Sequence, residues 1–454
     1  MQTDDIKRLA AIYLQAFERL GVSSSKPRTR KLALNIQLAM SAHGRNYHNL
    51  DHVFSFVDPD DPICTLAAMY HDVVYYQVDQ GFTPEILAII IPYIYDLEGE
   101  FYISRNIQEK DHLIWMTLDI FNLKAGQKLT SVDALNEFLS ALVLVRELGD
   151  LVEAKDLMRM IVCIEATIPF RGKNKAGLTP FEVMAKRLRK IARKYCSAPL
   201  KPHDIENTIK ASVIFSNKDI GNFSEPDPAR FLDNTWKLLP ETNAALRDRD
   251  AYSIRAYRLA LQKMRAFMMF VKPELVFNQF QGVPSDKEYR DMLDIASANI
   301  VIAREYLKVR LVAIAVLEAL AQASGGDTPL SIFMGDLSDQ AGNSPRIEDF
   351  LPEIQTPAWV DQAPIIRDLL EVGRASESNF DTRNSRLSLF VFKSLTPEGI
   401  DKVLGIAQEY FSGNIKPEAF LDQMDKPMVS AIARASASMV LMRRDKLIKF
   451  GSPN

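Results

Sequence analysis

Four of the six histidines in this chain lie within thirty positions of one another, from His43 to His71. His48 and His52 stand four positions apart in the segment RNYHNLDHVF, and Asp72 follows His71 directly in AAMYHDVVYY. Imidazole nitrogens and carboxylate oxygens together form a ligand set that suits divalent metal ions. The clustering of these residue types therefore predicts a metal site.

The sequence around the His71-Asp72 doublet predicts a buried helix, because CTLAAMYHDVVYY is apolar on nearly every face. A histidine and an ionised aspartate are costly in such a helix unless each has a partner, and one divalent cation would satisfy both. At the end of a helix both side chains can turn toward one ion. For an isolated doublet, a hydrogen-bonded His–Asp pair in the core is the alternative. We also expect His48 and His52 to share one helix face, since a helix turns once in 3.6 residues.

The elements that must position these residues are predicted to be helices. Apolar residues recur at intervals of three and four in segments such as IKRLAAIYLQAFERL, PFEVMAKRLRKIARKY and AYRLALQKMRAFMMFV. Helix start signals agree with this period, because Thr179-Pro180 with Glu182, and Thr396-Pro397, combine a capping residue with proline at the first helical position. No run of alternating strand residues bounded by hairpin turns stands out. The predicted fold class is all-α.

Composition and charge limit the classes of function. The chain has 454 residues, of which 47% are hydrophobic and 25% charged, as expected for a folded protein with a large core. The net charge of −3 provides no global positive field for nucleic acid, and we interpret the local basic stretches as solvated helix faces. The longest strongly apolar run, residues 86–95, is about half of a membrane span and contains Pro92. We therefore predict no membrane partner and no clear nucleic-acid surface.

The cysteines and the N-terminus indicate the compartment. The three cysteines are far apart in the sequence, which argues against a disulfide framework and for a reducing environment. The N-terminal segment MQTDDIKRLAAIYLQAF has the pattern of an amphipathic helix and not of a signal peptide. We predict a cytoplasmic protein with a first helical domain over residues 1–245 and a second helical region over 246–454, in which 323–364 is rich in loops.

The order of the motifs is similar to that of a known superfamily. A histidine, a later His-Asp doublet and a distant aspartate on a third helix resemble the pattern of the HD-domain metal-dependent phosphohydrolases. RNYHNLDHV and LAAMYHDVVYY are similar to the first two motifs of a bacterial branch of predicted HD phosphohydrolases. YHNLDHV is also similar to a motif of class I cyclic nucleotide phosphodiesterases, which belong to the same superfamily. The resemblance covers roughly residues 40–225 and nothing after about 245.

The resemblance implies a ligand set. The closing aspartate is expected after an apolar helix, and IKASVIFSNKDIGNF supplies Asp219 in that setting, with Asp156 and Asp119 as rival candidates. The metal ligands implied are His52, His71, Asp72 and Asp219. In the phosphodiesterase-like alignment His52 is the first ligand and His48 donates a proton to the leaving oxygen, whereas in the generic alignment His48 is itself the ligand. We favour His52 as the ligand.

The fold implied by the resemblance is an HD-domain helical bundle followed by a second helical region. The activity implied is a phosphohydrolase or phosphodiesterase that cleaves a nucleotide or other small phosphoester by metal-activated water, with His48 and Asp72 as catalytic residues and Mg, Mn, Fe, Zn or Ni as the divalent metal. Residues expected to contact the substrate are Arg45, Lys218, Glu165 and Arg171. Two alternatives stay open, namely a non-catalytic HD-fold module that binds a ligand or regulates, and an iron-dependent oxygenase.

Overall fold

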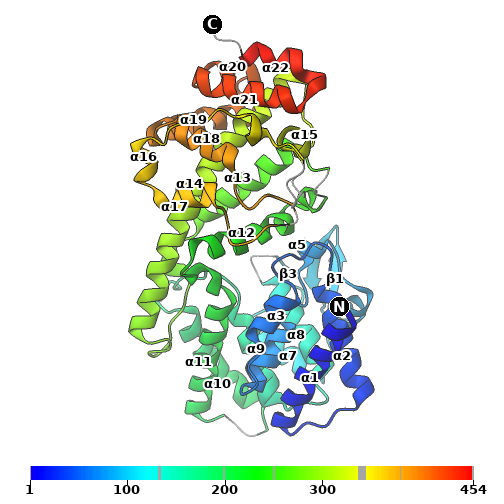
Figure 1. Ribbon diagram of the computed structural model, residues 1–454. Helices are drawn as coiled ribbons and strands as arrows, with labels where there is room; N and C mark the ends of the chain where they lie inside the picture. Colours follow the sequence, from blue (N-terminus) through cyan, green and yellow to red (C-terminus); the bar gives the residue numbers. More distant parts are fainter. Residues whose placement is uncertain are drawn as a thin grey trace. The chain divides into compact units, whose positions relative to one another are not determined.

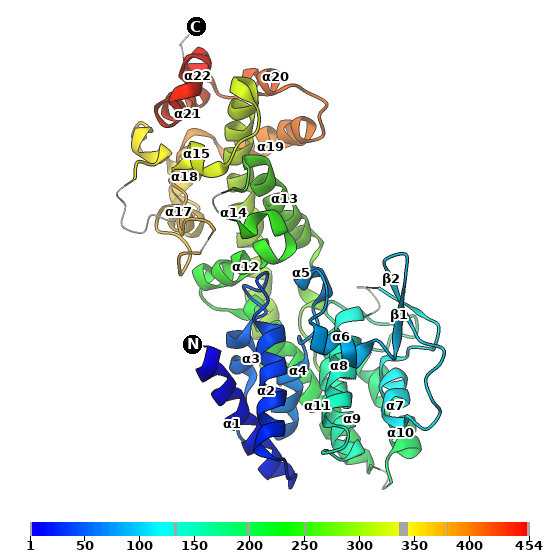
Figure 2. The ribbon, with the colours of Figure 1, turned by 90° about the vertical axis from the view of Figure 1, so that its right-hand side faces the viewer.

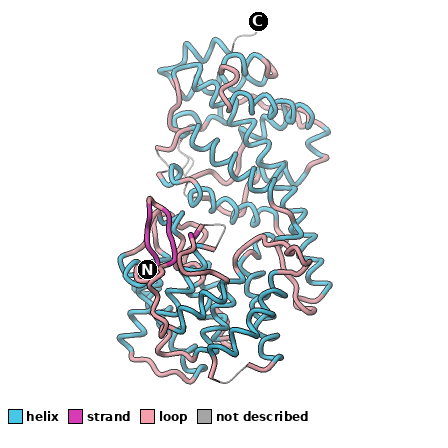
Figure 3. The backbone as a smooth tube through the Cα atoms, turned by 180° about the vertical axis from the view of Figure 1, so that it is seen from behind, coloured by secondary structure: helices cyan, strands magenta, loops and turns pink. Residues whose placement is uncertain are grey.

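The computed structural model describes residues 2–130, 134–197, 200–248, 251–335, 344–378 and 380–451. Most of these residues are helical, as Figure 3 shows in cyan, so the all-α class is confirmed. The chain divides into two compact units. Unit 1 comprises Met1–Gly221 and Lys272–Asp294, and unit 2 comprises Asn222–Val271 and Ile295–Asn454. The sequence suggested one boundary near residue 245, whereas in the structure unit 2 begins at Asn222 and residues 272–294 belong to unit 1.

Unit 1 is a bundle of helices with one small sheet. Figure 2 shows several of its helices running alongside one another. Its helices are α1 (Gln2–Leu20), α2 (Lys26–Met40), α3 (Leu50–Phe56), α4 (Pro62–Tyr70), α5 (Tyr76–Asp79), α6 (Pro84–Ile90), α7 (His112–Phe121), α8 (Leu135–Leu148), α9 (Ala154–Ala166), α10 (Pro180–Tyr195), α11 (Pro202–Asp219) and the short η3 (Pro273–Leu275).

Helix α4 lies at the centre of unit 1. It packs against α1, α3, α8 and α9, and α9 packs in turn against α11. Because neighbours cover α4 on every side, residues as different in direction as Leu66, Ala68 and Met69 are all fully buried. Each large apolar side chain buried in this way contributes about 1.5–3 kcal/mol to folding. The expectation of a buried helix before His71 is therefore confirmed.

The predicted helix start at Thr179 is confirmed in detail. Thr179 Oγ1 accepts a hydrogen bond from the backbone N–H of Glu182 at 3.2 Å, and the Glu182 carboxylate accepts one from the backbone N–H of Thr179 at 2.7 Å. This reciprocal capping box satisfies two of the backbone donors that the first turn leaves free. Thr396 caps α19 (Pro397–Phe411) in the same position, with its side chain accepting from the Gly399 N–H.

The sheet was not predicted from the sequence. Strand β1 (Ile94–Leu97) pairs antiparallel with β2 (Glu100–Ile103), which pairs with β3 (Lys128–Leu129). The two residues between β1 and β2, Glu98 and Gly99, both have positive φ, of 57° and 81°, as two-residue hairpins require. The apolar run over 86–95 is thus divided between α6 and β1. No helix in the described ranges has the length and apolarity that crossing a membrane requires.

Unit 2 is also helical. The 40-residue helix α14 (Asp286–Gly325) belongs to unit 1 as far as Asp294 and to unit 2 from Ile295, and its stretch from Tyr306 to Ala321 is buried on all faces (Figure 1). The other helices are η1 (Gly221–Ser224), which begins at the last residue of unit 1, α12 (Pro228–Thr242), η2 (Ala244–Arg247), α13 (Ile254–Phe270), α15 (Leu330–Met334), η4 (Ile347–Phe350), α16 (Ala358–Asp361), α17 (Pro364–Glu371), α18 (Arg386–Ser394), α19, α20 (Pro417–Asp422), α21 (Lys426–Met439), η5 (Leu441–Arg443) and α22 (Arg444–Gly451).

A buried polar cluster joins the helices of unit 2. The carboxylate of Asp381 accepts hydrogen bonds from Trp236 Nε1 at 2.8 Å, from the Tyr257 hydroxyl at 2.7 Å and from Arg310 Nη2 at 2.9 Å. The guanidinium of Arg374 forms a further ion pair with it at 3.6 Å. All five residues are at most 4% exposed. One carboxylate therefore ties α12, α13 and α14 to the loop after α17.

Candidate metal centre

Four side chains from three helices of unit 1 converge on one point. His52 lies on α3, His71 caps the C-terminus of α4, Asp72 follows it, and Asp219 is the last residue of α11. Each offers one ligand atom, and these atoms all lie within 4.8 Å of one another. The side chains are between 0% and 20% exposed, so the cluster is largely buried and only its two carboxylates and His52 retain some access to solvent.

The separations between the ligand atoms suit a metal ion. His52 Nε2 is 3.3 Å from His71 Nε2 and 3.2 Å from Asp219 Oδ1. His71 Nε2 is 3.0 Å from Asp72 Oδ2 and 3.4 Å from Asp219 Oδ1. Metal–ligand bonds of about 2.0–2.2 Å at octahedral or tetrahedral angles put neighbouring ligand atoms roughly 3.0–3.5 Å apart. The four groups therefore fit a divalent cation with little rearrangement.

The hydrogen bonds around the cluster also leave ligand atoms available. His71 Nδ1 lies 2.8 Å from the backbone oxygen of Ala68, which can only accept, so Nδ1 carries a proton and Nε2 is the nitrogen that faces the cluster. Asp72 Oδ2 is buried and accepts no well-directed hydrogen bond from the described residues, although His71 Nε2 lies 3.0 Å from it. A buried carboxylate oxygen without a donor is unfavourable unless a cation approaches it.

The charges within the cluster shift its protonation equilibria strongly. Burial lowers the pKa of His71, but the carboxylates of Asp72 and Asp219 outweigh burial and raise that pKa well above its usual value. Burial raises the pKa of Asp72, but the charges of His71 and His48 outweigh burial and lower that pKa well below its usual value. Burial also raises the pKa of Asp219, but hydrogen bonds from His52 and His71 outweigh burial and lower that pKa below its usual value. Both carboxylates are therefore ionised at neutral pH.

The first histidine motif differs from the expected helix. Helix α3 begins at Leu50, because the side chain of Asn49 accepts hydrogen bonds from the backbone N–H groups of Asp51 and His52 and caps it. Because Asn49 is a preferred N-cap residue and the helix begins after it, His48 lies outside α3. The expectation that His48 and His52 share a helix face is therefore wrong. The two imidazole rings still lie close, with centroids 5.6 Å apart.

The His71-Asp72 doublet sits at the end of a helix, as expected. Helix α4 ends at Tyr70, and the chain turns immediately afterwards. Helix α8 holds the segment that follows, because Ser140 Oγ accepts a hydrogen bond from the Val74 N–H at 3.1 Å and Asn136 Oδ1 accepts one from the Tyr76 N–H at 3.1 Å. These bonds fix the backbone on the far side of the doublet.

A buried network of side chains fixes the near side of the doublet. Tyr13 donates to the Tyr70 hydroxyl at 2.9 Å, and Tyr70 donates to Glu147 Oε2 at 2.8 Å. Asn35 donates to the other oxygen of the same carboxylate at 2.5 Å. Burial, together with the charge of Glu147, raises the pKa of both tyrosines well above the usual value, so they stay protonated as donors. The network locks the last turn of α4 immediately before His71.

Aromatic rings form the apolar wall of the site. The ring of Phe56 lies 5.0 Å from that of His52 and 5.2 Å from that of His71. Phe215 lies 5.9 Å from the His71 ring and packs against Phe56 at 5.4 Å. The ammonium of Lys218 lies 5.4 Å from the centre of the Phe56 ring, and Lys218 is exposed. This lysine, predicted to contact the substrate, is therefore near the cluster and free to reach an anion in solvent.

Arg45, which was predicted to bind the substrate, is instead buried in an ion pair. Its side chain is 0% exposed and forms a two-pronged ion pair with Asp79, at 2.8 and 2.6 Å. Arg45 Nη1 also donates to the backbone oxygen of Asp72 at 2.6 Å. Arg45 is therefore a positioning residue that connects the first motif to the doublet. The sequence did not indicate this, because Asp79 lies 34 positions away.

Glu165 and Arg171, two further predicted substrate contacts, pair with each other. The Arg171 guanidinium donates to Glu165 Oε1 at 2.8 Å and to Oε2 at 3.2 Å. Glu165 is 6% exposed in its side chain, whereas Arg171 is 28% exposed. Arg187 lies close enough for its charge to interact with both. Arg171 thus keeps part of its guanidinium accessible, and the Glu165 carboxylate serves to orient it.

Glu137 is a candidate functional residue that was not predicted. It lies in the first turn of α8 and is half-buried. Burial, helped by the charges of Asp72 and Asp219 and opposed by that of Arg171, raises the pKa of Glu137 to about 7. This carboxyl therefore lies within electrostatic range of both metal-ligand candidates and of Arg171. An acid in the otherwise apolar helix sequence LNEFLSALVLV was the available signal.

The rival candidates for the closing aspartate have other partners. Asp119 accepts hydrogen bonds from Lys194 at 2.9 Å and from the Tyr195 hydroxyl at 2.7 Å. Asp156 pairs with Arg159 at 3.2 Å. Neither belongs to the group of potential ligand atoms found among the described residues, so Asp219 is the aspartate that joins His71 and Asp72.

Comparison of the chain with protein-family models, with curated proteins and with solved structures finds no match. The chemistry of the site therefore follows from its donor set alone. Two imidazole nitrogens and two carboxylate oxygens, with a partly exposed side, suit a divalent cation that keeps some positions for water or substrate.

Proposed function

We propose that this protein is a metal-dependent phosphohydrolase or phosphodiesterase that cleaves a nucleotide or another small phosphoester. The convergence of His52, His71, Asp72 and Asp219 within 4.8 Å is the observation that carries the proposal. These four residues would hold the cation. When bound, a divalent cation lowers the pKa of water from 15.7 toward about 7 and neutralises charge on a phosphoryl oxygen.

The neighbouring residues of the chain supply the proton chemistry. The imidazole of His48, beside the rings of His52 and Tyr75, is the proposed donor to the leaving oxygen. A positioned acid of this kind contributes typically about 10²- to 10⁴-fold to the rate. Glu137, with a pKa of about 7, exists in both protonation states at neutral pH and can carry a proton to or from the site. Asp72 would act as a ligand of the cation, while the bond from His71 Nδ1 to the backbone oxygen of Ala68 at 2.8 Å orients His71.

Two cationic side chains are proposed to recognise the phosphoester. Lys218 holds an ammonium over Phe56 at the edge of the cluster, and Arg171 offers the exposed part of a guanidinium that Glu165 orients. A guanidinium of this kind matches the geometry of phosphate oxygens, while an ammonium acts as a point charge.

We place the reaction in the cytoplasm, because the three cysteines are free thiols, as in a reducing compartment.

The test measures phosphate release by the full chain. The purified protein is loaded in turn with Mg²⁺, Mn²⁺, Fe²⁺, Zn²⁺ and Ni²⁺ and assayed on nucleoside phosphates, cyclic nucleotides and a chromogenic phosphodiester. We expect metal-dependent release that Asp219→Asn abolishes. Asp156→Asn is the matched control, because this carboxylate pairs with Arg159 and should leave activity unchanged.

Three outcomes separate the alternatives. A rate lowered by about 10² or more in His48→Ala, with unchanged metal content, supports a catalytic role for His48. A protein that binds metal but turns over none of these substrates would instead be a ligand-binding or regulatory module. Oxygen consumption by the iron-loaded protein would favour an oxygenase. A folded protein that neither retains nor responds to any of the five cations would end the proposal.

A further inference from the structure

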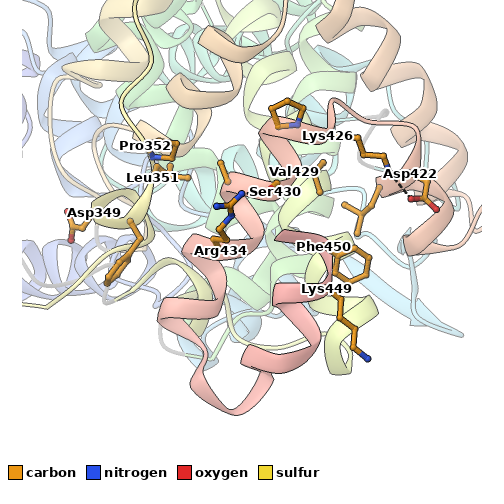
Figure 4. A pocket seen from close by; sticks show the side chains of 14 residues that line it. Asp349, Leu351, Pro352, Asp422, Lys426, Val429, Ser430, Arg434, Lys449 and Phe450 are labelled. Carbon is orange, nitrogen blue, oxygen red and sulfur yellow. Dashed lines mark hydrogen bonds and ion pairs between the residues drawn. The ribbon is translucent and has the colours of Figure 1, made fainter. Parts of the chain in front are cut away.

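Unit 2 contains a pocket of about 890 Å³ that is separate from the metal-ligand cluster. It lies between η4 and the residues after it, the end of α20, one face of α21 and the end of α22. Figure 4 shows Arg434 and Ser430 near its centre, with Leu351 and Pro352 on one side and Phe450 on the other. The volume lies within the roughly 300–1,000 Å³ that small-molecule sites occupy.

Apolar side chains make most of the pocket wall. Leu351 and Val429 lie on opposite sides of it, and Phe350 and Phe450 add aromatic rings. Phe350 is 42% exposed, so its ring is accessible to a ligand in the pocket. A wall of this kind favours the apolar body of a ligand, because each Å² of apolar surface removed from water contributes to binding.

One cation in the pocket is held in a fixed orientation. Arg434 Nη2 donates to Ser430 Oγ at 2.8 Å, and Ser430 Oγ donates to the backbone oxygen of Gly451 at 2.9 Å. The stem of Arg434 packs closely against Gly451, since a Cβ atom at that glycine would lie only 2.9 Å from Arg434 Cγ. The guanidinium is therefore pre-organised, and its other N–H groups are available to a ligand.

The pocket lining carries three cations, Lys426, Arg434 and Lys449, against two acids, Asp349 and Asp422. The acids on its rim are already engaged: Asp422 pairs with Lys426 at 2.7 Å, and Asp349 accepts from the Arg346 N–H at 2.8 Å. Within the described part of the chain, no ion pair involves Arg434 or Lys449. A guanidinium held in this way beside apolar side chains attracts a single anionic group, whereas the Lys449 side chain points away from the pocket centre in Figure 4.

We infer that this pocket is a second ligand site, which binds a small organic anion. The ligand has an apolar ring or alkyl body that packs on Leu351, Val429 and Phe450, and one carboxylate, sulfonate or phosphate group that Arg434 binds. This site belongs to unit 2 and does not depend on the proposed phosphohydrolase activity. It gives the second half of the chain a binding role.

The test uses an aromatic sulfonate, 1-anilinonaphthalene-8-sulfonate, as the probe for the full chain. Its fluorescence is expected to saturate at one site per chain. Decanoate should displace the probe, whereas decylamine and inorganic phosphate should not, because the first lacks the anion and the second lacks the apolar body. Arg434→Gln should weaken probe binding about 10- to 100-fold, as expected for loss of charge-assisted hydrogen bonds.

The controls separate the site from unspecific binding. Lys402→Gln removes an exposed charge on α19, outside the pocket, and should bind the probe like the wild type. Phe350→Ala should weaken binding by removing wall surface, and Asp219→Asn should leave it unchanged. Near-UV circular dichroism verifies folding, and Arg434→Lys together with Phe350→Ala replaces Arg434→Gln if that variant does not fold. Equal affinity of the pocket variants and the wild type, or displacement by decylamine, would overturn the inference.

Discussion

Replacement of Arg45 tests whether this residue positions the site or binds phosphate. In Arg45→Met, Asp79 loses two charge-assisted hydrogen bonds, of 2.8 and 2.6 Å, and the backbone oxygen of Asp72 loses a donor at 2.6 Å. Removing one partner of a buried ion pair costs about 3–5 kcal/mol, because the other charge stays behind without a partner. Asp79 is 16% exposed, so water relieves part of that cost and we expect about 3 kcal/mol.

The assay is urea denaturation of the full chain, followed by circular dichroism and tyrosine fluorescence. With a slope of about 2–3 kcal/mol per M, a loss of about 3 kcal/mol lowers the urea midpoint by about 1 M. Arg45→Met combined with Asp79→Leu removes both charges and should recover most of the stability. Affinity for Mn²⁺ should fall about 10- to 100-fold in the single variant, because Arg45 supports the backbone of a ligand.

The result that would refute this account of Arg45 is a single variant with unchanged midpoint and unchanged metal affinity. If such a variant also showed a raised KM for the phosphoester, Arg45 would contact the substrate after all. A loss of stability that the double variant does not recover would also contradict the ion-pair explanation.

The pKa of about 7 at Glu137 predicts how the stability of the metal-free protein depends on pH. Since the folded-state pKa is raised above its ordinary value of 4.5, the stabilisation is full below about pH 4.5 and is lost as pH rises through about 7. The raised pKa of His71 adds a loss of stability with rising pH in both proteins, so urea titrations in chelator should find a loss about 3 kcal/mol larger in the wild type than in Glu137→Gln. In unit 2, Asp381→Asn leaves two buried guanidinium groups without a counter-charge, so we expect a loss of about 3–5 kcal/mol in thermal or urea unfolding. Asp368→Asn is the matched control, because its ion pair with Arg367 is exposed and should contribute at most about 1 kcal/mol, and equal effects of the two substitutions would contradict the buried cluster.

The parts of the fold that were predictable are those that local chemistry decides. Helix α10 begins at the capping box of Thr179 and Glu182, which the sequence displays directly. The buried character of α4 followed from its apolar residues. His71 and Asp72 were singled out because histidine and aspartate seldom enter an apolar core without a partner, whereas His52 and Asp219 were named from the motif order that the resemblance implies.

The parts that were missed depend on residues far apart in the sequence. Arg45 looks like a phosphate ligand until the fold brings Asp79 to it. Glu137 gained its unusual pKa only through burial and through carboxylates that lie on other elements. His48 was placed on the wrong element because a cap at Asn49 outweighed the helical period. No local sequence pattern indicates that residues 272–294 return to unit 1 between two stretches of unit 2.

The most direct measurement is an anomalous-scattering map of crystals of the full chain soaked in Mn²⁺. The account predicts one strong peak about 2.0–2.3 Å from His52 Nε2, His71 Nε2 and a carboxylate oxygen of both Asp72 and Asp219. A well-ordered site with no peak, or a peak bound only by other residues, would contradict the claim that these four side chains form a metal centre.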